Sequence, residues 1–171
     1  MRRAGIVAAL VVLAGCAVSN TEASVAPARA NDAVLARIAG EVSTGGAGAY
    51  LAHVSEQDAG WRHLLERLAA GDAAALALAA KLRPAADAGN AEALDISAAR
   101  GLPKAPGAVL ALVDAGAPLS ALCTSPFIEA EAEVEAAYNR KAIAALEAMP
   151  PGERPAAYPA CLAALRAIGK R

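Results

Sequence analysis

Two histidines are the best candidates for acid–base or metal chemistry in this sequence. His53 and His63 lie ten residues apart, with carboxylates between and beside them, a composition that hydrolytic and metal-dependent sites use. No HExxH, HxH or CxxC spacing accompanies them, and no serine has the GxSxG setting of a nucleophile. We therefore expect no catalytic residue and no metal site. A cell-envelope hydrolase or metal-dependent enzyme using His53 and His63 is the alternative.

Cofactor chemistry is equally poorly represented. The glycine-rich run at residues 43–48 lacks the Lys-Ser/Thr end of a phosphate-binding loop and follows no strand pattern, so we expect no cofactor. The net charge of −1 lacks the basic footprint of a nucleic-acid binder, and we expect no nucleic-acid partner.

The first sixteen residues have the three parts of an export signal. Arg2 and Arg3 give a positive start, an apolar run follows over residues 4–12, and Leu13-Ala14-Gly15-Cys16 ends it. These last four residues resemble the lipobox of bacterial lipoproteins. The resemblance implies a signal peptide over 1–15, cleavage before Cys16 and acylation, including palmitate-type chains, on Cys16. An ordinary signal peptide cut later, after the Ala28-Arg29-Ala30 site, is the alternative.

The lipoprotein resemblance also implies a location. Two or three acyl chains on Cys16, at about 0.8 kcal/mol per buried methylene, make a stable membrane anchor. Ala17 stands where an aspartate would retain such proteins in the inner membrane, so the outer membrane is expected where the source has two. Residues 16–30 are polar and small without apolar periodicity, which predicts a flexible tether. We expect a lipid-anchored protein on the periplasmic side of the cell envelope.

Residues 31–171 are predicted to form one all-α domain. Alanine supplies 51 of the 171 residues, aromatic residues only 3%, and alanine and leucine favour helices over sheets. Turn and cap signals divide this part into about six to eight helices with short links, which describes a small helical bundle or a short solenoid of antiparallel helix pairs. One segment resembles a single ankyrin repeat, and a stable array needs at least three.

Particular residues set the expected helix boundaries. Asn31 or Asp32 is predicted to cap a first helix that Gly40 ends, and Tyr50, Leu51 and Val54 suggest a short second helix. Asp58 and Asp72 are predicted to cap the two helices after that. Trp61, Leu64, Leu65 and Leu68 form the strongest amphipathic stripe and predict a buried face. Further predicted boundaries are a cap at Asn90, helix ends at Gly71 and Gly101, a start at Pro106, a longest helix over about 130–149, and a final helix from Pro159.

Cys123 and Cys161 remain once Cys16 is assigned to the anchor. An even pair in an exported chain predicts a disulfide, because oxidising compartments preserve such bonds. Two buried free thiols, or a catalytic or metal role for them, are the alternatives.

A second resemblance covers about residues 61–165. Trp61 with Leu64 and Leu65, Arg83-Pro84, Cys123 with Pro126-Phe127-Ile128-Glu129, and Cys161 are similar to a group of small exported bacterial helical proteins. The resemblance implies the helical fold and the cysteine pair but supplies no activity. We expect a non-catalytic, membrane-anchored module that binds a protein or peptide of the envelope through a helical surface or groove.

Overall fold

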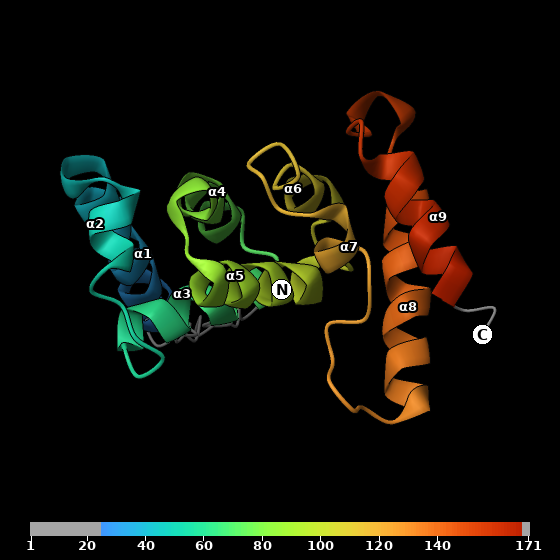
Figure 1. The fold of residues 1–171 in the computed structure, drawn as a ribbon, viewed down its shortest axis with the longest axis horizontal. Coiled ribbons are helices and arrows are strands. Elements are labelled where there is room, and N and C mark those ends of the chain that lie inside the picture. The colour runs from blue at the N-terminus through green and yellow to red at the C-terminus, as the bar shows by residue number, and fades with distance from the viewer. Residues whose placement is uncertain (1–24, 169–171) are drawn as a thin grey trace, which may run out of the picture.

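The fold is all-helical, as the sequence predicts. A computed structural model describes residues 25–168, in which nine α-helices and two short 3₁₀ turns follow one another without a strand. Six helices have ten or more residues (Figure 1). The elements are α1 Val25–Gly45, α2 Ala47–Leu51, α3 Ala59–Ala69, α4 Ala73–Leu82, η1 Arg83–Ala85, α5 Ala88–Gly101, α6 Pro106–Leu110, α7 Leu119–Leu122, α8 Ala132–Glu147, η2 Pro151–Glu153 and α9 Tyr158–Ile168.

The helices stack in two layers in chain order. α1, α3, α5, α7 and α9 each contact the next member of that series, and α2, α4, α6 and α8 do the same. Pairs such as α1 with α2, α3 with α4 and α8 with α9 join the layers. The chain therefore advances along one axis from α1 at one end to α8 and α9 at the other (Figure 1), the arrangement of a short solenoid.

The predicted cap residues form most of the helix junctions. Asp58 and Asp72 each accept a hydrogen bond from a backbone N–H three residues on, at 2.7 and 3.0 Å. Gly71 has φ of +75°, the left-handed conformation that ends α3 and lets α4 turn back along it. At α5, however, Asp87 and not Asn90 is the cap, and its carboxylate accepts from the Asn90 N–H. The prediction missed that Asp87 also suits this position.

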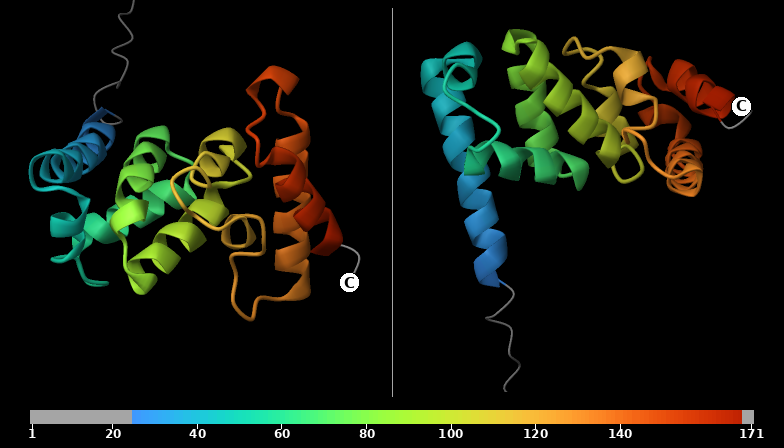
Figure 2. Two further views of the ribbon diagram at one scale, coloured as in Figure 1. Left: turned by 45° about the horizontal axis from the view of Figure 1, so that its top comes forward. Right: turned by 60° about the horizontal axis from the view of Figure 1, so that its bottom comes forward.

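The first helix differs from the prediction at both ends. α1 begins at Val25, inside the segment assigned to the tether, and continues through Gly40 to Gly45. Pro27 does not prevent this start, because backbone N–H groups of the first turn have no partner within the helix. A single glycine lowers the stability of a helix by only about 1 kcal/mol relative to alanine. The burial of Ile38 and Val42 on either side of Gly40 offsets this loss, so the helix continues through Gly40. α1, with 21 residues, is therefore longer than α8, with 16. Its N-terminal half projects beyond the neighbouring helices (Figure 2).

One apolar core runs through both layers. Trp61, Leu64 and Leu68 of the predicted stripe are buried, whereas Leu65 is half-buried. Gly101 marks a close approach of α5 to α3, because a Cβ added there would lie 2.4 Å from the carbonyl oxygen of Leu68. Ala99, on the same helix, is also fully buried. None of the described helices combines the length and hydropathy needed to cross a bilayer.

Candidate functional site

A groove between α5 and the chain after α7 is the candidate site. Its volume is about 480 Å³, within the range of ligand-binding pockets. One wall is the N-terminal part of α5 with the preceding η1, and the other is the irregular segment that follows α7. The lining is mostly apolar and consists of Arg83, Ala88, Ala91, Glu92, Asp95, Ile96, Ala121, Thr124, Ser125, Pro126, Phe127 and Ile128.

An ion pair lies in the α5 wall. Arg83 Nε donates to Asp95 Oδ1 at 2.9 Å, and Arg83 Nη2 donates to Asp95 Oδ2 at 3.1 Å. The side chains are only 17% and 7% exposed, so each charge depends on the other for compensation. This geometry joins η1 to α5 and leaves no free charge on either residue for a ligand.

Residues 124–128, which we call the wall segment, are fixed by side-chain contacts instead of regular structure. The Phe127 ring meets the Tyr138 ring edge-on at a centroid distance of 5.6 Å, and Arg100 lies 5.8 Å from the Phe127 centroid. Ser125 Oγ and Glu135 Oε1 are hydrogen-bonded at 3.2 Å. The wall segment is therefore attached to both α5 and α8.

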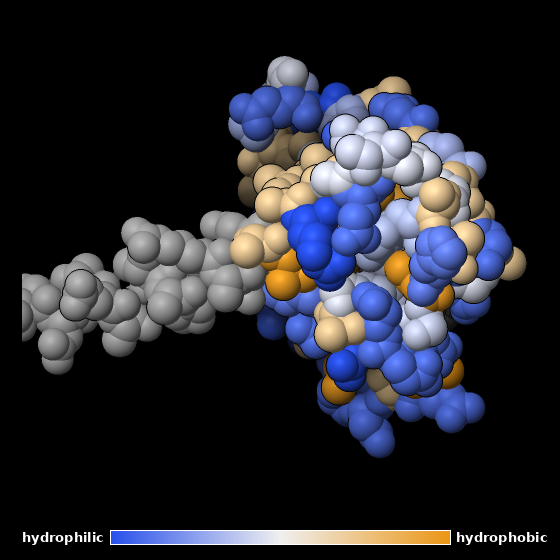
Figure 3. All heavy atoms as spheres, turned by 90° about the vertical axis from the view of Figure 1, so that its left-hand side faces the viewer, coloured by the Kyte–Doolittle hydropathy of each residue, from blue (hydrophilic) through white to orange (hydrophobic). Residues whose placement is uncertain are grey.

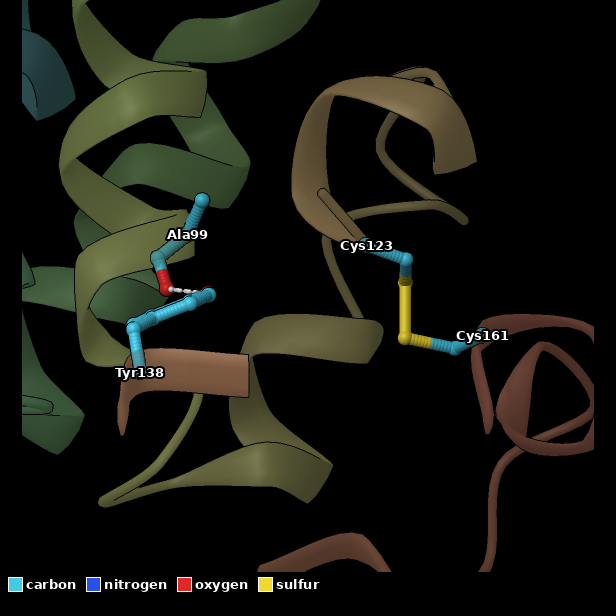
Figure 4. The surroundings of a disulfide bond; sticks show 4 residues. All are labelled: Ala99, Cys123, Tyr138 and Cys161. Carbon is cyan, nitrogen blue, oxygen red and sulfur yellow. Dashed lines mark hydrogen bonds between the residues drawn. A yellow bond between two sulfur atoms is a disulfide. The ribbon is translucent and has the colours of Figure 1, made fainter. Parts of the chain in front are cut away.

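The predicted disulfide stands directly before the wall segment. Cys123 and Cys161 are bonded, with their Cα atoms 5.2 Å apart, and connect the end of α7 to α9 (Figure 4). Nearby, Tyr138 Oη donates a 2.7 Å hydrogen bond to the Ala99 carbonyl, joining α8 to α5. Burial raises the pKa of Tyr138 well above its ordinary value, so this phenol is a neutral donor. Both links hold the C-terminal helices against the wall of the groove.

The mouth of the groove exposes a large apolar side chain. Ile128 is 82% exposed, and the only other exposed large apolar residue among the described residues is Val134, at 46%. The next residue, Glu129, has φ of +53°, which is uncommon for a residue with a Cβ. By contrast, the face over α1 and α2 mixes hydrophilic side chains with separated apolar ones (Figure 3).

The histidines do not belong to this groove. His53 is exposed in the turn after α2, and His63 is half-buried on α3, with its Nε2 atom buried and without a hydrogen-bond partner in the described structure. Among the described side chains, no three His, Cys, Asp or Glu residues are grouped so that they would hold a metal ion. Cys16, the predicted lipidation site, lies outside the described residues.

Sequence reasoning did not identify the groove, although signals for it exist. Asp95 is a charged residue on the same side of α5 as Ala91 and Leu94, which are buried. A charge on the buried side of a helix requires a partner of opposite charge. Arg83, in the turn before α5, is such a partner for Asp95. The Phe127-Ile128 pair stands in a loop between a cysteine and a run of glutamates, and two adjacent large apolar residues in such a loop are a signal of a contact or a binding surface.

The sequence was also compared with known proteins. It matches no protein-family model, and no curated protein and no solved structure matches it. No family is shown by these comparisons.

Proposed function

We propose that the protein is a lipid-anchored, non-catalytic module of the bacterial cell envelope whose groove binds an apolar segment of a protein or peptide partner. The groove itself supports this function, because it is open, mostly apolar and bordered by Ile128, which is 82% exposed. Covering an isoleucine side chain contributes roughly 1.5–3 kcal/mol to association. Exposed apolar side chains at a concave surface are typical of interaction sites.

The chemistry of the lining supports binding over catalysis. None of the groove-lining residues is a histidine or a cysteine. Arg83 is paired with Asp95 and Ser125 is hydrogen-bonded to Glu135, and the one lining carboxylate outside these contacts, Glu92, is exposed on the α5 side of the groove. A general base needs a free position facing the substrate, and these contacts leave the groove with an apolar surface and an acidic edge.

The disulfide and the leader support the location. A Cys123–Cys161 bond persists in oxidising compartments such as the periplasm. The anchor at Cys16 would join the domain through α1, at one end of the helix stack, whereas the groove is formed further along by α5 and the wall segment (Figure 1). A partner could thus reach the groove while the protein is held at the membrane.

Membrane fractionation of a Cys16→Ser variant tests the anchor. The wild-type protein should sediment with membranes and carry labelled palmitate, and the variant should lose the label and the sedimentation. A variant that stays membrane-bound without label would contradict lipid anchoring at this residue.

Photo-crosslinking in intact cells tests the groove. A photoreactive residue at Ile128 should give a discrete adduct whose partner is identified by mass spectrometry. The same residue at Ala163, which is exposed on α9, is the matched control and should give no such adduct. Equal adducts from both positions would indicate nonspecific collision and count against the groove.

A further inference from the structure

We infer that the partner lies in the groove as an extended chain and pairs its backbone with that of the wall segment. This inference rests on the proposed function and adds the conformation of the partner and the kind of contact it makes. It is carried by the main-chain groups of residues 124–128, all of which line the groove.

The wall segment is itself extended and runs between α5 and α8 (Figure 1). Ser125 is hydrogen-bonded to Glu135 of α8, and Phe127, two residues on, packs against Tyr138 of the same helix. Side chains at i and i+2 face the same way in an extended chain, whereas a helix would turn them about 200° apart. Glu129, with φ of +53°, ends the stretch.

The backbone of this stretch has no hydrogen-bond partner within the described chain. The last backbone bond before it runs from the Cys123 N–H to the Leu119 carbonyl, and the first after it runs from the Val134 N–H to the Glu131 carbonyl. No described side chain bonds to the main chain of residues 124–130 either. Apart from Pro126, which has no N–H, each residue of the wall segment therefore offers one donor and one acceptor.

These main-chain groups select the conformation of the occupant. A partner that covers the wall segment removes water from them, and buried N–H and C=O groups need hydrogen-bond partners. A helical partner cannot supply these bonds, because its own backbone groups are bonded within the helix, and lipid chains carry no such groups. An extended peptide offers donors and acceptors at the matching spacing, which is how unpaired strands recruit a further strand.

Strand pairing also determines the sequence pattern of the partner. Successive side chains of a strand point to opposite faces, so every second side chain of the bound segment can enter the apolar groove while those between face away from it. The wall segment has five residues, and the paired part of the partner should have about the same length. We expect apolar residues at alternate positions over that length, and burial of the exposed Ile128 side chain against them.

Backbone-methylated peptides test this inference. Three fluorescent heptapeptide pools share randomised valine, leucine, isoleucine or phenylalanine at odd positions and glutamine at even positions. One pool has unmodified amides, and the other two carry N-methyl groups on all odd or on all even residues. Because the N–H groups of alternate residues point to opposite edges of a strand, only one methylated pool loses its bonds to the wall segment.

Affinity for the full-length protein in a nonionic detergent is measured by anisotropy. Loss of two or three hydrogen bonds, each worth about fivefold, should weaken one methylated pool by at least about tenfold relative to the other. The unmodified pool should also slow hydrogen exchange at the amides of Thr124, Ser125, Phe127 and Ile128, which have no backbone partner in the free protein.

A groove variant separates the possible outcomes. Ala88→Trp, which places an indole on an exposed residue of the lining, should weaken the unmodified pool, and Ala163→Trp on α9 should not. Equal affinities of the two methylated pools, or unchanged exchange in the wall segment, with binding that Ala88→Trp abolishes, would overturn strand pairing and leave the groove function standing. Absence of binding by every pool, or binding that Ala88→Trp does not affect, would overturn both.

Discussion

Arg83 and Asp95 form a two-point ion pair that joins the turn after α4 to the middle of α5. Their atoms meet at 2.9 and 3.1 Å, twelve residues apart in the chain, and both side chains are largely buried. The pair fixes the position of one groove wall relative to the helix that precedes it. It also explains how a charged residue is accommodated within the buried side of α5.

Removing one member of this pair should be more harmful than removing both. Arg83→Met leaves Asp95 buried without compensation and should lower the free energy of unfolding by about 3 kcal/mol. Arg83→Met/Asp95→Leu should recover most of that loss, because no buried charge remains. Urea denaturation of the single and double variants measures the difference. A double variant as unstable as the single one would contradict this account of the pair.

Gly101 should be the least replaceable small residue of the helix stack. An added Cβ would lie 2.4 Å from the Leu68 carbonyl oxygen, so Gly101→Ala must separate α3 from α5 and should destabilise the fold by about 1–3 kcal/mol. Gly40→Ala, which lies within α1, is the matched control. A Cβ added at Gly40 would meet nothing within 4 Å. This control should stabilise the protein by up to about 1 kcal/mol, since alanine favours helix over glycine. Thermal unfolding of the two variants should therefore shift in opposite directions.

The disulfide should contribute a large part of the stability. Closing a loop of 38 residues is worth about 4 kcal/mol in the chain-entropy model. Cys123→Ala/Cys161→Ala, or reduction of the wild type, should lower the denaturant midpoint accordingly. The wall segment begins one residue after Cys123, so peptide affinity should also fall in the variant under conditions where it is still folded. Unchanged stability in both the reduced protein and the variant would show that the bond is dispensable.

Acid should destabilise the α3–α4 turn through Asp72. Partial burial raises the pKa of this carboxyl, but hydrogen bonds from the Ala75 N–H and from Arg67 outweigh that effect and leave the pKa below its ordinary value. A lowered pKa in the folded state gives stability that is complete above the pKa of the unfolded chain and is lost as pH falls through that of the folded one. Asp72→Asn keeps an N-cap acceptor and removes the charge. Between neutral pH and about pH 3, its urea midpoint should change less than that of the wild type; an equal change would assign the acid sensitivity to other residues.

Local sequence signals predicted the helices well because they depend on neighbours in the chain. Asp58, Asp72 and Gly71 act where their types and spacing indicate, and the even cysteine pair is bonded. Trp61 belongs to the core, as its place on a leucine stripe predicts.

The groove was not predictable in the same way because its walls are 25 or more residues apart in the chain. Whether Phe127 packs on Tyr138 or faces solvent depends on where α8 docks, and that position follows from tertiary contacts such as the Tyr138–Ala99 hydrogen bond. The prediction of where α1 begins was wrong for a different reason. A short alanine-rich stretch with one proline fits both a flexible tether and a first helical turn.

The most direct test of the groove as a binding site is the photo-crosslinked adduct at Ile128, measured in cells with and without Ala88→Trp. Ala88 is exposed and lines the groove, so the indole should obstruct the site without disturbing the core. We predict that Ala88→Trp abolishes the adduct, whereas Ala163→Trp, on the exposed side of α9, leaves it unchanged. An adduct of equal yield in both variants would contradict binding in the groove.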